Sequence, residues 1–338
     1  MKQYRVAVVG AMGAVGSEML KILQEENFPI ERVKPLDVGV NVGKEILFNG
    51  KPVKVEESKP GAFGDVDFAL FAVGAEVSRK LAPVAAAEGA IVIDNSSCWR
   101  MDPEVPLVVP EVNPQDLKWH KGIIANPNCS TIIAMVPLKP LHDYAHINRI
   151  IASTYQAVSG AGIAGLNELR DQSREVLEGK PVTPHAFQHQ IAFNLIPHID
   201  VFEDNAYTHE EMKMFNEGRK ILGEPNLMVN CTCVRVPVFR SHSESITIET
   251  ERPLSPDKAR ELLANAPGVK VVDCPEKLEY PMPWDTSDQN LIYVGRIRDD
   301  ISSNGNSLTF WCCGDQIRKG AAFNAVQIAE TMIKMGLC

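Results

Sequence analysis

The sequence lacks several features that mark particular classes of protein. No apolar run approaches the length of a membrane-spanning helix, and no segment is repeated or of low complexity. None of the eight cysteines forms a Cys-x-x-Cys pair, and Cys231-x-Cys233 with Cys312-Cys313 is poorly spaced for zinc. Positive charge is scarce, since 34 Lys and Arg against 43 Asp and Glu leave a net charge of −9. We therefore expect no membrane or nucleic-acid partner, and reduced thiols in a cytoplasmic protein.

Two pairs of histidines have the i, i+4 spacing that can place metal ligands on one helix face. They are His142 with His146 and His185 with His189. Neither pair has a carboxylate-rich motif beside it. We interpret them as surface or packing histidines and expect no metal.

The first part of the chain alternates between buried strands and helices. The expected strands lie at 6–9, 33–36, 66–73, 90–94 and 122–125, with helices from about 17 to 24 and over 76–88. Continuous apolar strands separated by helices indicate an α/β fold with a doubly wound parallel sheet. A short segment over 48–55 is typical of an antiparallel hairpin.

After about residue 128 the pattern changes to an α+β domain. Longer strands of antiparallel character are expected over 149–158, 230–236 and 245–251, and helices over 166–178, 209–222 and 256–265. A final helix over 320–335 is apolar on one face, and we expect it to pack on the first domain. The predicted domains are 1–127, completed by 316–338, and 128–315; 338 residues suffice for both.

A glycine-rich turn follows the first predicted strand and precedes a helix. Gly10, Gly13 and Gly16 have the spacing that lets backbone approach a pyrophosphate, which then lies at the helix N-terminus. The other residues expected to contact a dinucleotide here are Met12, Ala14 and Val15. Asp37 ends the second predicted strand, where a carboxylate can bind the hydroxyls of an adenosine ribose. Taken alone, the glycine pattern is weak evidence for a dinucleotide site, and Asp37 could also be a turn residue.

Cys129 lies where the strand at 122–125 stops at Asn-Pro-Asn and a helical segment begins. The unpaired N–H groups and dipole of a helix N-terminus favour a thiolate, the nucleophile of acyl transfer. The same N–H groups can stabilise an oxyanion. The alternative is a buried, inert thiol, which is the commoner fate of an intracellular cysteine.

Six segments together make the chain resemble the aspartate-semialdehyde dehydrogenases, most closely the bacterial type. They are 94–102 (Asp-Asn-Ser-Ser-Cys-Trp-Arg-Met-Asp), 108–113 (Val-Val-Pro-Glu-Val-Asn), 126–131 (Asn-Pro-Asn-Cys-Ser-Thr), 153–162 (Ser-Thr-Tyr-Gln-Ala-Val-Ser-Gly-Ala-Gly), 234–244 (Val-Arg-Val-Pro-Val-Phe-Arg-Ser-His-Ser-Glu) and 318–322 (Arg-Lys-Gly-Ala-Ala). The resemblance spans the chain and implies a Rossmann domain plus a catalytic and dimer-forming α+β domain, as in glyceraldehyde-3-phosphate dehydrogenase. It also implies a homodimer.

The resemblance further implies reductive dephosphorylation of L-aspartyl 4-phosphate to L-aspartate 4-semialdehyde, on the route to lysine, threonine, methionine and diaminopimelate. Cys129 would be the nucleophile and His242 the acid/base, with Gln156 orienting the acyl group. Arg235 would bind the α-carboxylate of the substrate, and Glu210 its free amino group.

Further residues take their expected roles from the same resemblance. Arg100 and Lys213 fall where the family binds phosphate, and Asn128 falls among its substrate-binding residues. Ser159, Gly160 and Gln316 are expected at the cofactor; many relatives have asparagine in place of Gln316. Glu211 is better interpreted as the capping-box partner of Thr208, which is why we favour Glu210 for the amino group.

The chain departs from the family at the end of the second strand. Members that use NADP typically have Leu-Ala-Ser-x-Arg-Ser-x-Gly-Lys, whereas residues 36–44 are Leu-Asp-Val-Gly-Val-Asn-Val-Gly-Lys. Val40 and Asn41 thus replace the residues that hold the 2′-phosphate, and the carboxylate of Asp37 repels it. The expected cofactor is NAD(P)(H); the family usually uses NADP, but in this chain we expect NAD(H) to be used well or preferred.

Each of these residues also has a simpler interpretation when taken alone. Arg235 and Lys213 could be surface charges, His242 a hydrogen-bonded loop histidine, and Gln156 a partner for strand backbone. An N-acetyl-glutamyl-phosphate reductase would share the fold and chemistry, but its acylated amine gains little from Glu210. A non-catalytic dinucleotide-binding relative would be expected to lack the cysteine or the histidine.

Overall fold

The computed structural model describes residues 2–303 and 305–338, which form two units. The first unit consists of Met1–Asn128 and Ala321–Cys338, and the second of Cys129–Gly320. The sequence predicts boundaries at 127/128 and 315/316, whereas in the structure residues 316–320 belong to the second unit. Each unit is built around its own six-stranded sheet.

The sheet of the first unit is parallel throughout, with strand order β5-β2-β1-β6-β7-β8. Its strands are β1 (Tyr4–Val9), β2 (Ile30–Asp37), β5 (Glu56–Glu57), β6 (Phe68–Phe71), β7 (Ile91–Asp94) and β8 (Ile123–Ala125). The order runs outward from β1 in both directions, which makes the carboxyl end of β1 the switch point where dinucleotides bind in such sheets. The expected hairpin is confirmed as the antiparallel pair β3 (Glu45–Phe48) and β4 (Lys51–Lys54).

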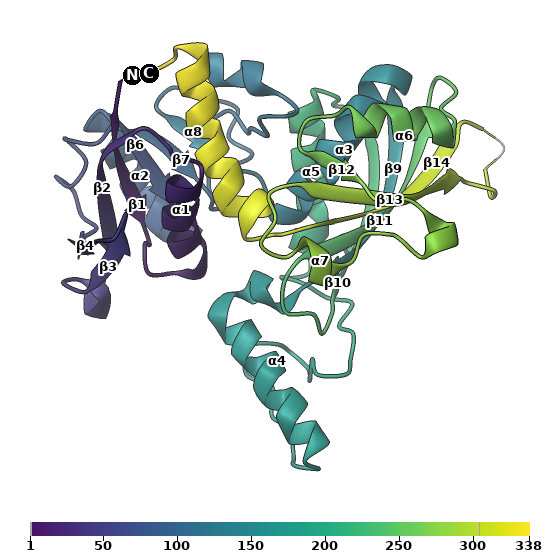
Figure 1. Ribbon diagram of the computed structural model, residues 1–338, viewed down its shortest axis with the longest axis horizontal. Coiled ribbons are helices and arrows are strands. Elements are labelled where there is room, and N and C mark those ends of the chain that lie inside the picture. Colours follow the sequence, from purple (N-terminus) through teal and green to yellow (C-terminus); the bar gives the residue numbers. More distant parts are fainter. Residues whose placement is uncertain (1, 304) are drawn as a thin grey trace. The chain divides into compact units, whose positions relative to one another are not determined.

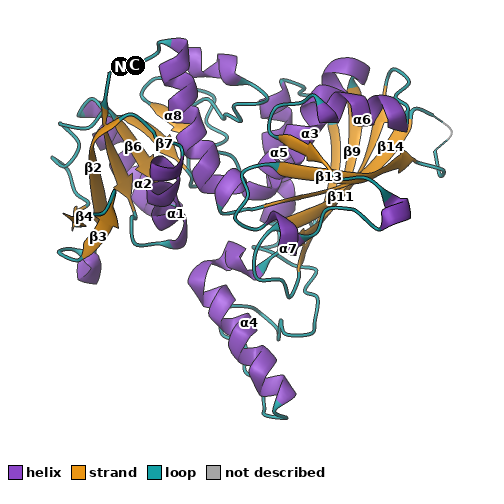
Figure 2. Ribbon diagram, in the orientation of Figure 1, coloured by secondary structure: helices purple, strands orange, loops and turns teal. Residues whose placement is uncertain are grey.

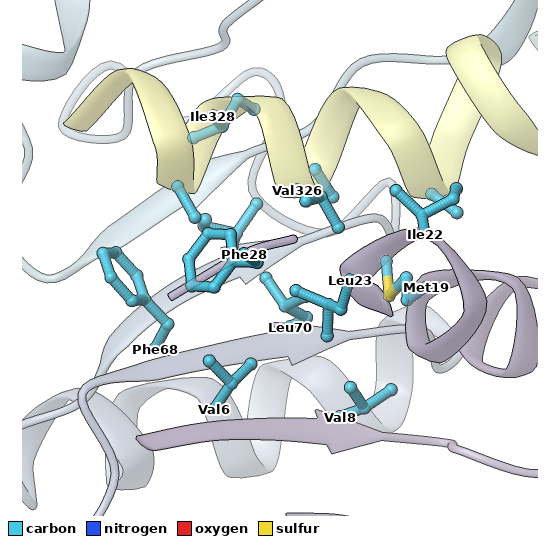
Figure 3. Packing of buried hydrophobic residues seen from close by; sticks show 14 of the residues in the cluster. Val6, Val8, Met19, Ile22, Leu23, Phe28, Phe68, Leu70, Val326 and Ile328 are labelled. Carbon is cyan, nitrogen blue, oxygen red and sulfur yellow. The ribbon is translucent and has the colours of Figure 1, made fainter. Parts of the chain in front are cut away.

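Helix α8 closes the core of the first unit (Figure 3). The helices of this unit are α1 (Ala14–Glu25), α2 (Ala75–Ala87) and α8 (Phe323–Met335), with short turns η1 (Gly39–Asn41) and η2 (Pro114–Trp119). Val326 and Ile328 of α8 share one buried cluster with Met19 and Ile22 of α1 and Leu70 of β6. The prediction that the last helix packs on the first domain is therefore confirmed.

The sheet of the second unit is mixed, with strand order β10-β9-β11-β14-β13-β12. Its strands are β9 (Ile147–Gln156), β10 (Met228–Arg235), β11 (His242–Thr250), β12 (Val269–Val271), β13 (Ile292–Asp299) and β14 (Ser307–Gly314). The four central strands are antiparallel, as expected for β9 and β11. The antiparallel prediction is wrong for β10, which runs parallel to β9 because a long helical crossover joins the two strands.

Three helices cover the sheet of the second unit: α3 (Cys129–Ala145), α5 (His209–Leu222) and α6 (Pro256–Ala264) (Figure 2). The remaining helices and turns are η3 (Val158–Ala161), α4 (Gly162–Leu177), η4 (Pro275–Lys277), α7 (Pro283–Thr286) and the π-turn η5 (Arg318–Ala322). Helix α4 extends away from the sheet (Figure 1). Across residues 2–303 and 305–338, no helix combines the length and apolar character needed to cross a membrane.

Candidate active site

The glycine turn between β1 and α1 is shaped by close backbone contacts. Gly10 has φ +80°, and a Cβ there would lie 2.5 Å from the carbonyl oxygen of Ala72. A Cβ on Gly16 would overlap the carbonyl oxygen of Gly10, whereas one on Gly13 would meet nothing closer than 3.4 Å. Met12 lies in the turn, Ala14 and Val15 open α1, and no acidic residue lies in the first helical turn. The turn therefore fits a pyrophosphate at the helix N-terminus.

The carboxylate of Asp37 supports this turn. Its Oδ2 accepts a hydrogen bond of 3.0 Å from the Met12 N–H, and its Oδ1 accepts one of 2.8 Å from the Val38 N–H. A carboxylate has about four lone-pair positions, so acceptor capacity remains for ribose hydroxyls. Asp37 is thus both a structural anchor and a candidate ribose ligand.

The expected 2′-phosphate region lies on the short turn η1. Val40 is 86% exposed there and offers no polar atom from its side chain. The Oδ1 of Asn41 accepts a 2.8 Å hydrogen bond from Lys44 Nζ. One cation therefore remains near this turn, although the arginine of NADP-using relatives is absent.

Arg100 lies at the carboxyl edge of the parallel sheet. Its Nε donates to the carbonyl of Asn126 at 3.0 Å and its Nη2 to that of Asn95 at 2.8 Å, so the ends of β8 and β7 hold the guanidinium. Arg100 and Asn128 are both buried in the first unit. A fixed, buried guanidinium is suited to binding phosphate.

Cys129 is the first residue of α3, as the sequence predicts. Its thiol therefore lies at the positive end of a 17-residue helix, where the helix dipole favours a thiolate. The backbone of Gly320 lies against it, because a Cβ at Gly320 would be 3.0 Å from the Cβ of Cys129. The segment 318–322 carried the resemblance, but its contact with the cysteine was not predicted.

The peptide group of Ala157 holds two of the expected catalytic side chains. Its N–H donates to Nδ1 of His242 at 3.0 Å, and its carbonyl accepts from Nη1 of Arg235 at 2.7 Å. Gly160 lies beside both, since a Cβ there would be 2.8 Å from Arg235 Nη1 and 3.6 Å from His242 Nε2. Arg235 also interacts electrostatically with Cys129. The structure thus brings Cys129, Arg235 and His242 together.

Burial shapes the charges of this cluster. Complete burial, together with the positive charge of Arg235, lowers the pKa of His242 to about 3, with Glu210 opposing the change. Burial also lowers the pKa of Arg235, opposed by Glu210 and Cys129. The imidazole is therefore neutral at pH 7 and the guanidinium remains charged.

A chain of hydrogen bonds fixes the acyl-orienting amide and the carboxylate. Gln156 Oε1 accepts from Thr154 Oγ1 at 2.9 Å, and Gln156 Nε2 donates to Glu210 Oε1 at 3.1 Å. Lys213 Nζ lies 2.9 Å from both Glu210 Oε2 and Asp200 Oδ2. Burial alone lowers the pKa of Lys213, but the two carboxylates reverse this and raise it. Lys213 therefore keeps its positive charge beside Glu210.

The preference for Glu210 over Glu211 agrees with the geometry of α5. Glu211 forms the capping box: its Oε2 accepts from the Thr208 N–H at 2.7 Å, and Thr208 Oγ1 accepts from its N–H at 3.3 Å. Its other oxygen accepts from the N–H of Cys233. Glu211 is therefore committed to the helix start, and Glu210 faces Gln156.

The expected cofactor residues of the second unit form a small hydrogen-bonded group. Gln316 Nε2 donates to Ser159 Oγ, and Gln316 Oε1 accepts from the Ser241 N–H at 2.8 Å. Both side chains are buried. The amide of Gln316 is thus fixed in orientation, in keeping with a residue that recognises a carboxamide.

Sequence reasoning did not predict Ala157, Thr154 or Asp200. Ala157 acts through backbone atoms, which leave no signal in the side-chain sequence, and Asp200 lies in a loop 13 residues before Lys213.

The histidine pair His142 and His146 has a carboxylate neighbour that the sequence did not reveal. Oε1 of Glu224 lies 3.5 Å from His142 Nε2 and 3.8 Å from His146 Nδ1. The Ile147 N–H donates to His142 Nδ1, which leaves the ring proton on Nε2, facing Glu224. A metal-binding histidine needs the opposite arrangement, so the geometry favours histidines paired with a carboxylate over metal ligands.

Two family models match the chain. The model described as "Semialdehyde dehydrogenase, NAD binding domain" matches residues 5–120, and "Semialdehyde dehydrogenase, dimerisation domain" matches residues 138–319. The aspartate-semialdehyde dehydrogenase of Aquifex aeolicus is 53% identical over 340 residues, covering 99% of both chains. That of Campylobacter jejuni is 50% identical over 340 residues, covering 99% of this chain and 98% of its own.

A solved structure extends the similarity to three dimensions. The crystal structure of aspartate semialdehyde dehydrogenase II from Vibrio cholerae, complexed with ASA, superposes with a TM-score of 0.96 at 45% identity. The match covers 99% of each chain. The similarity therefore includes both units in full.

Proposed function

Since the chain belongs to the aspartate-semialdehyde dehydrogenase family, we propose that it reduces L-aspartyl 4-phosphate to L-aspartate 4-semialdehyde through a thioester on Cys129. It is an NAD(P)-dependent oxidoreductase of the aspartate-derived amino-acid pathway. Its two units correspond to the dinucleotide-binding and dimerisation domains of that family.

The observation that carries this proposal is the set of charged groups around Cys129. Arg235 interacts electrostatically with both Cys129 and Glu210. Glu210 in turn accepts hydrogen bonds from Gln156 and Lys213. The substrate has an α-carboxylate, an ammonium and a phosphate. We assign Arg235 to the carboxylate, Glu210 to the ammonium and Lys213 to the phosphate-bearing end. In the first unit, the family resemblance assigns Arg100 and Asn128 to phosphate and substrate binding.

The first chemical step is attack of the Cys129 thiolate on the acyl carbon. A carbon–sulfur bond forms, the bond from carbon to the phosphate oxygen breaks, and phosphate leaves with the electron pair. Gln156, whose amide orientation is fixed by Thr154 and Glu210, orients the acyl group. The thiolate is stabilised by the N-terminus of α3 and by Arg235.

The dinucleotide would be held by the residues of the glycine turn, Gly10, Met12, Gly13, Ala14, Val15 and Gly16, and by Asp37. Ser159, Gly160 and Gln316 would bind its nicotinamide end. When bound, it supplies the hydride that reduces the acyl group.

Substitution of the nucleophile tests the proposal. The variant Cys129→Ala is expected to fold normally and to have no phosphate-dependent oxidation of aspartate semialdehyde, because no other thiol lies at the start of α3. Cys98→Ala is the matched control. Cys98 is a free cysteine of the first unit, and its substitution is expected to leave turnover near that of the unmodified enzyme. Substantial activity in Cys129→Ala would contradict the proposal.

The choice between the two nicotinamide cofactors is a second proposal. We propose that NAD(H) is used well or preferred, because Val40 and Asn41 offer no cation and Asp37 repels a 2′-phosphate. Lys44, held by Asn41, is the nearby cation that allows some use of NADP.

The ratio of kcat/KM for NADH over NADPH measures this preference. We expect a ratio of one or more in the unmodified enzyme and a fall of about tenfold or more in Asp37→Asn, which removes the charge and keeps an acceptor for one of the two backbone N–H groups. Asp65→Asn, which removes the carboxylate that pairs with Lys34 and Arg32, is the control and should leave the ratio unchanged. A wide preference of the unmodified enzyme for NADPH would contradict the assignment.

We also propose a homodimer that acts in the cytoplasm. The dimerisation-domain match supports the first, and the eight free cysteines support a reducing compartment. The buried carboxylate of Glu210 suits a free ammonium and disfavours the acylated amine of an N-acetyl-glutamyl-phosphate reductase.

A further inference from the structure

The loop before α5 presents a second carboxylate to Lys213, besides that of Glu210. Lys213 Nζ donates to Asp200 Oδ2 at 2.9 Å and to Glu210 Oε2 at the same distance. The side chain of Lys213 is 15% exposed and that of Asp200 is 34% exposed. Because the pair is partly shielded from solvent, its charges interact more strongly than those of a surface ion pair.

The backbone around Asp200 holds this carboxylate in place. Asp200 has φ +70°, in the left-handed region, and its Oδ1 accepts a 2.9 Å hydrogen bond from the Val201 N–H. The carbonyl of Val201 in turn accepts one of 2.7 Å from the N–H of His209, the first residue of α5. Asp200 is therefore tied to the start of the helix that carries Lys213, with its Oδ2 directed at the ammonium group.

The charge of Asp200 opposes a phosphate at Lys213. Burial alone raises the pKa of Asp200, but the hydrogen bond and the positive charge of Lys213 outweigh this and lower it. Asp200 is therefore ionised at neutral pH. An ammonium group has three donors, so Lys213 can bind a phosphate oxygen while it still contacts both carboxylates. The phosphate then shares its cation with Asp200, whose negative charge repels it.

We propose that Asp200 is a counter-ion that competes with phosphate for Lys213 and so promotes the release of inorganic phosphate once the thioester has formed. This inference rests on the proposed function, because the phosphate in question is the group displaced by Cys129. Asp200 acts through Lys213 and touches no reacting atom. It sets the affinity of the site for phosphate.

The two ends of the substrate explain why such a counter-ion is useful. Before the reaction, the phosphate is covalently joined to an aspartyl group that Arg235 and Glu210 hold. After the carbon–oxygen bond breaks, the aspartyl group is bound to Cys129, and phosphate is retained only by its own contacts. A charge that weakens those contacts therefore speeds release of the product, while the substrate keeps its other two points of attachment.

The variant Asp200→Asn tests the proposal. It removes the charge but keeps a side-chain oxygen, and asparagine tolerates the left-handed backbone at this position. The measurement is KM for inorganic phosphate in the oxidation of aspartate semialdehyde. We expect this KM to fall by about tenfold, because one negative charge beside the phosphate is lost. KM for aspartate semialdehyde, which has no phosphate, should stay within about twofold of the unmodified value.

A second variant and a second assay support the same test. Asp200→Gly removes the whole side chain, and φ +70° is unstrained for glycine, so we expect KM for phosphate to fall here too. In the reductive direction, the inhibition constant of inorganic phosphate should fall in both variants. Asp204→Asn is the matched control, since it removes an exposed carboxylate from the same loop and should leave both constants unchanged.

The direction of the change decides between a competing charge and a supporting contact. If Asp200 only held Lys213 in position, its loss would leave KM for phosphate unchanged or raise it, and either result in Asp200→Asn or Asp200→Gly would overturn the inference. The proposed function is judged on the unmodified enzyme in the same assay. If that enzyme oxidises aspartate semialdehyde without phosphate, or fails to oxidise it, the proposed function fails. If oxidation requires phosphate and the variants show no fall in KM, only the inference fails.

Discussion

Glu244 lies on β11 two residues after His242, and its carboxyl group is completely enclosed. Its cross-strand neighbours are Thr154 on β9 and Cys312 on β14. Neither carboxyl oxygen has a hydrogen-bond partner within the described part of the chain. Burial, with smaller contributions from Cys233 and Glu210, raises the pKa of Glu244 well above its usual value. The side chain therefore stays protonated and neutral, two residues along β11 from His242.

This neutral acid makes stability depend on pH. The folded state keeps a proton that the unfolded state loses near pH 4.5, so the free energy of unfolding falls as pH rises, by about 1.4 kcal/mol per unit, until the folded-state pKa is reached. We expect Glu244→Gln, which is neutral and of similar shape, to remove this slope. Urea denaturation of both proteins between pH 5 and 9 measures it.

Glu261→Gln is the control, because Glu261 is an exposed residue of α6 paired with Lys258. The plot of its free energy of unfolding against pH should run parallel to that of the unmodified protein. A parallel curve for Glu244→Gln as well would show that Glu244 is ionised in the folded state.

At the scale of secondary structure, the start of α5 determines where the substrate-binding charges lie. The capping box of Thr208 and Glu211 fixes the first turn, which contains Glu210, and Lys213 lies just after it on the same helix. Helix α6 has a comparable N-cap, since Ser255 Oγ accepts from the Lys258 N–H at 3.2 Å, but carries no residue of the site. Comparing variants of the two caps therefore distinguishes the effect of a lost N-cap on stability from its effect on substrate binding.

We expect Thr208→Ala and Ser255→Ala each to lower the free energy of unfolding by about 1 kcal/mol, the usual contribution of an N-cap. Only Thr208→Ala should also raise KM for aspartate semialdehyde, by several-fold, because the first turn of α5 frays and Glu210 loses its fixed position. Thermal or urea denaturation and steady-state kinetics measure the two effects. A similar rise of KM in Ser255→Ala would contradict the link between the cap and the site.

At the scale of the whole molecule, the sequence predicts the first unit better than the second. Strands buried on both faces, such as β6 and β7, stand out as apolar runs between helices. Strands β13 and β14 were not predicted. In β13, Gly295 and exposed arginines interrupt the apolar pattern, and β14 is buried on nearly every residue and shows no alternation.

The residues of the site also fall into two groups: those that the side-chain motifs of the sequence predict and those that they do not. Cys129, Gln156, Arg235 and His242 could be named because their chemistry is specific and their motifs occur in family order. The peptide group of Ala157 could not, because its role depends on where the chain places an N–H and a carbonyl. The orientation of the His242 ring, whose Nδ1 accepts from that N–H, is equally invisible in the sequence.

The chain enters the first unit at its beginning and returns to it only at Ala321. During synthesis on a ribosome, β1, α1 and β6 emerge early, yet Val326 and Ile328, which complete their core, emerge only after the whole second unit. The second unit, by contrast, has all of its residues once Gly320 is outside the exit tunnel. The apolar core surface of the dinucleotide-binding half therefore stays uncovered until residues 321–338 have been made, and a ribosome that stalls before or within them leaves a nascent chain in need of a chaperone.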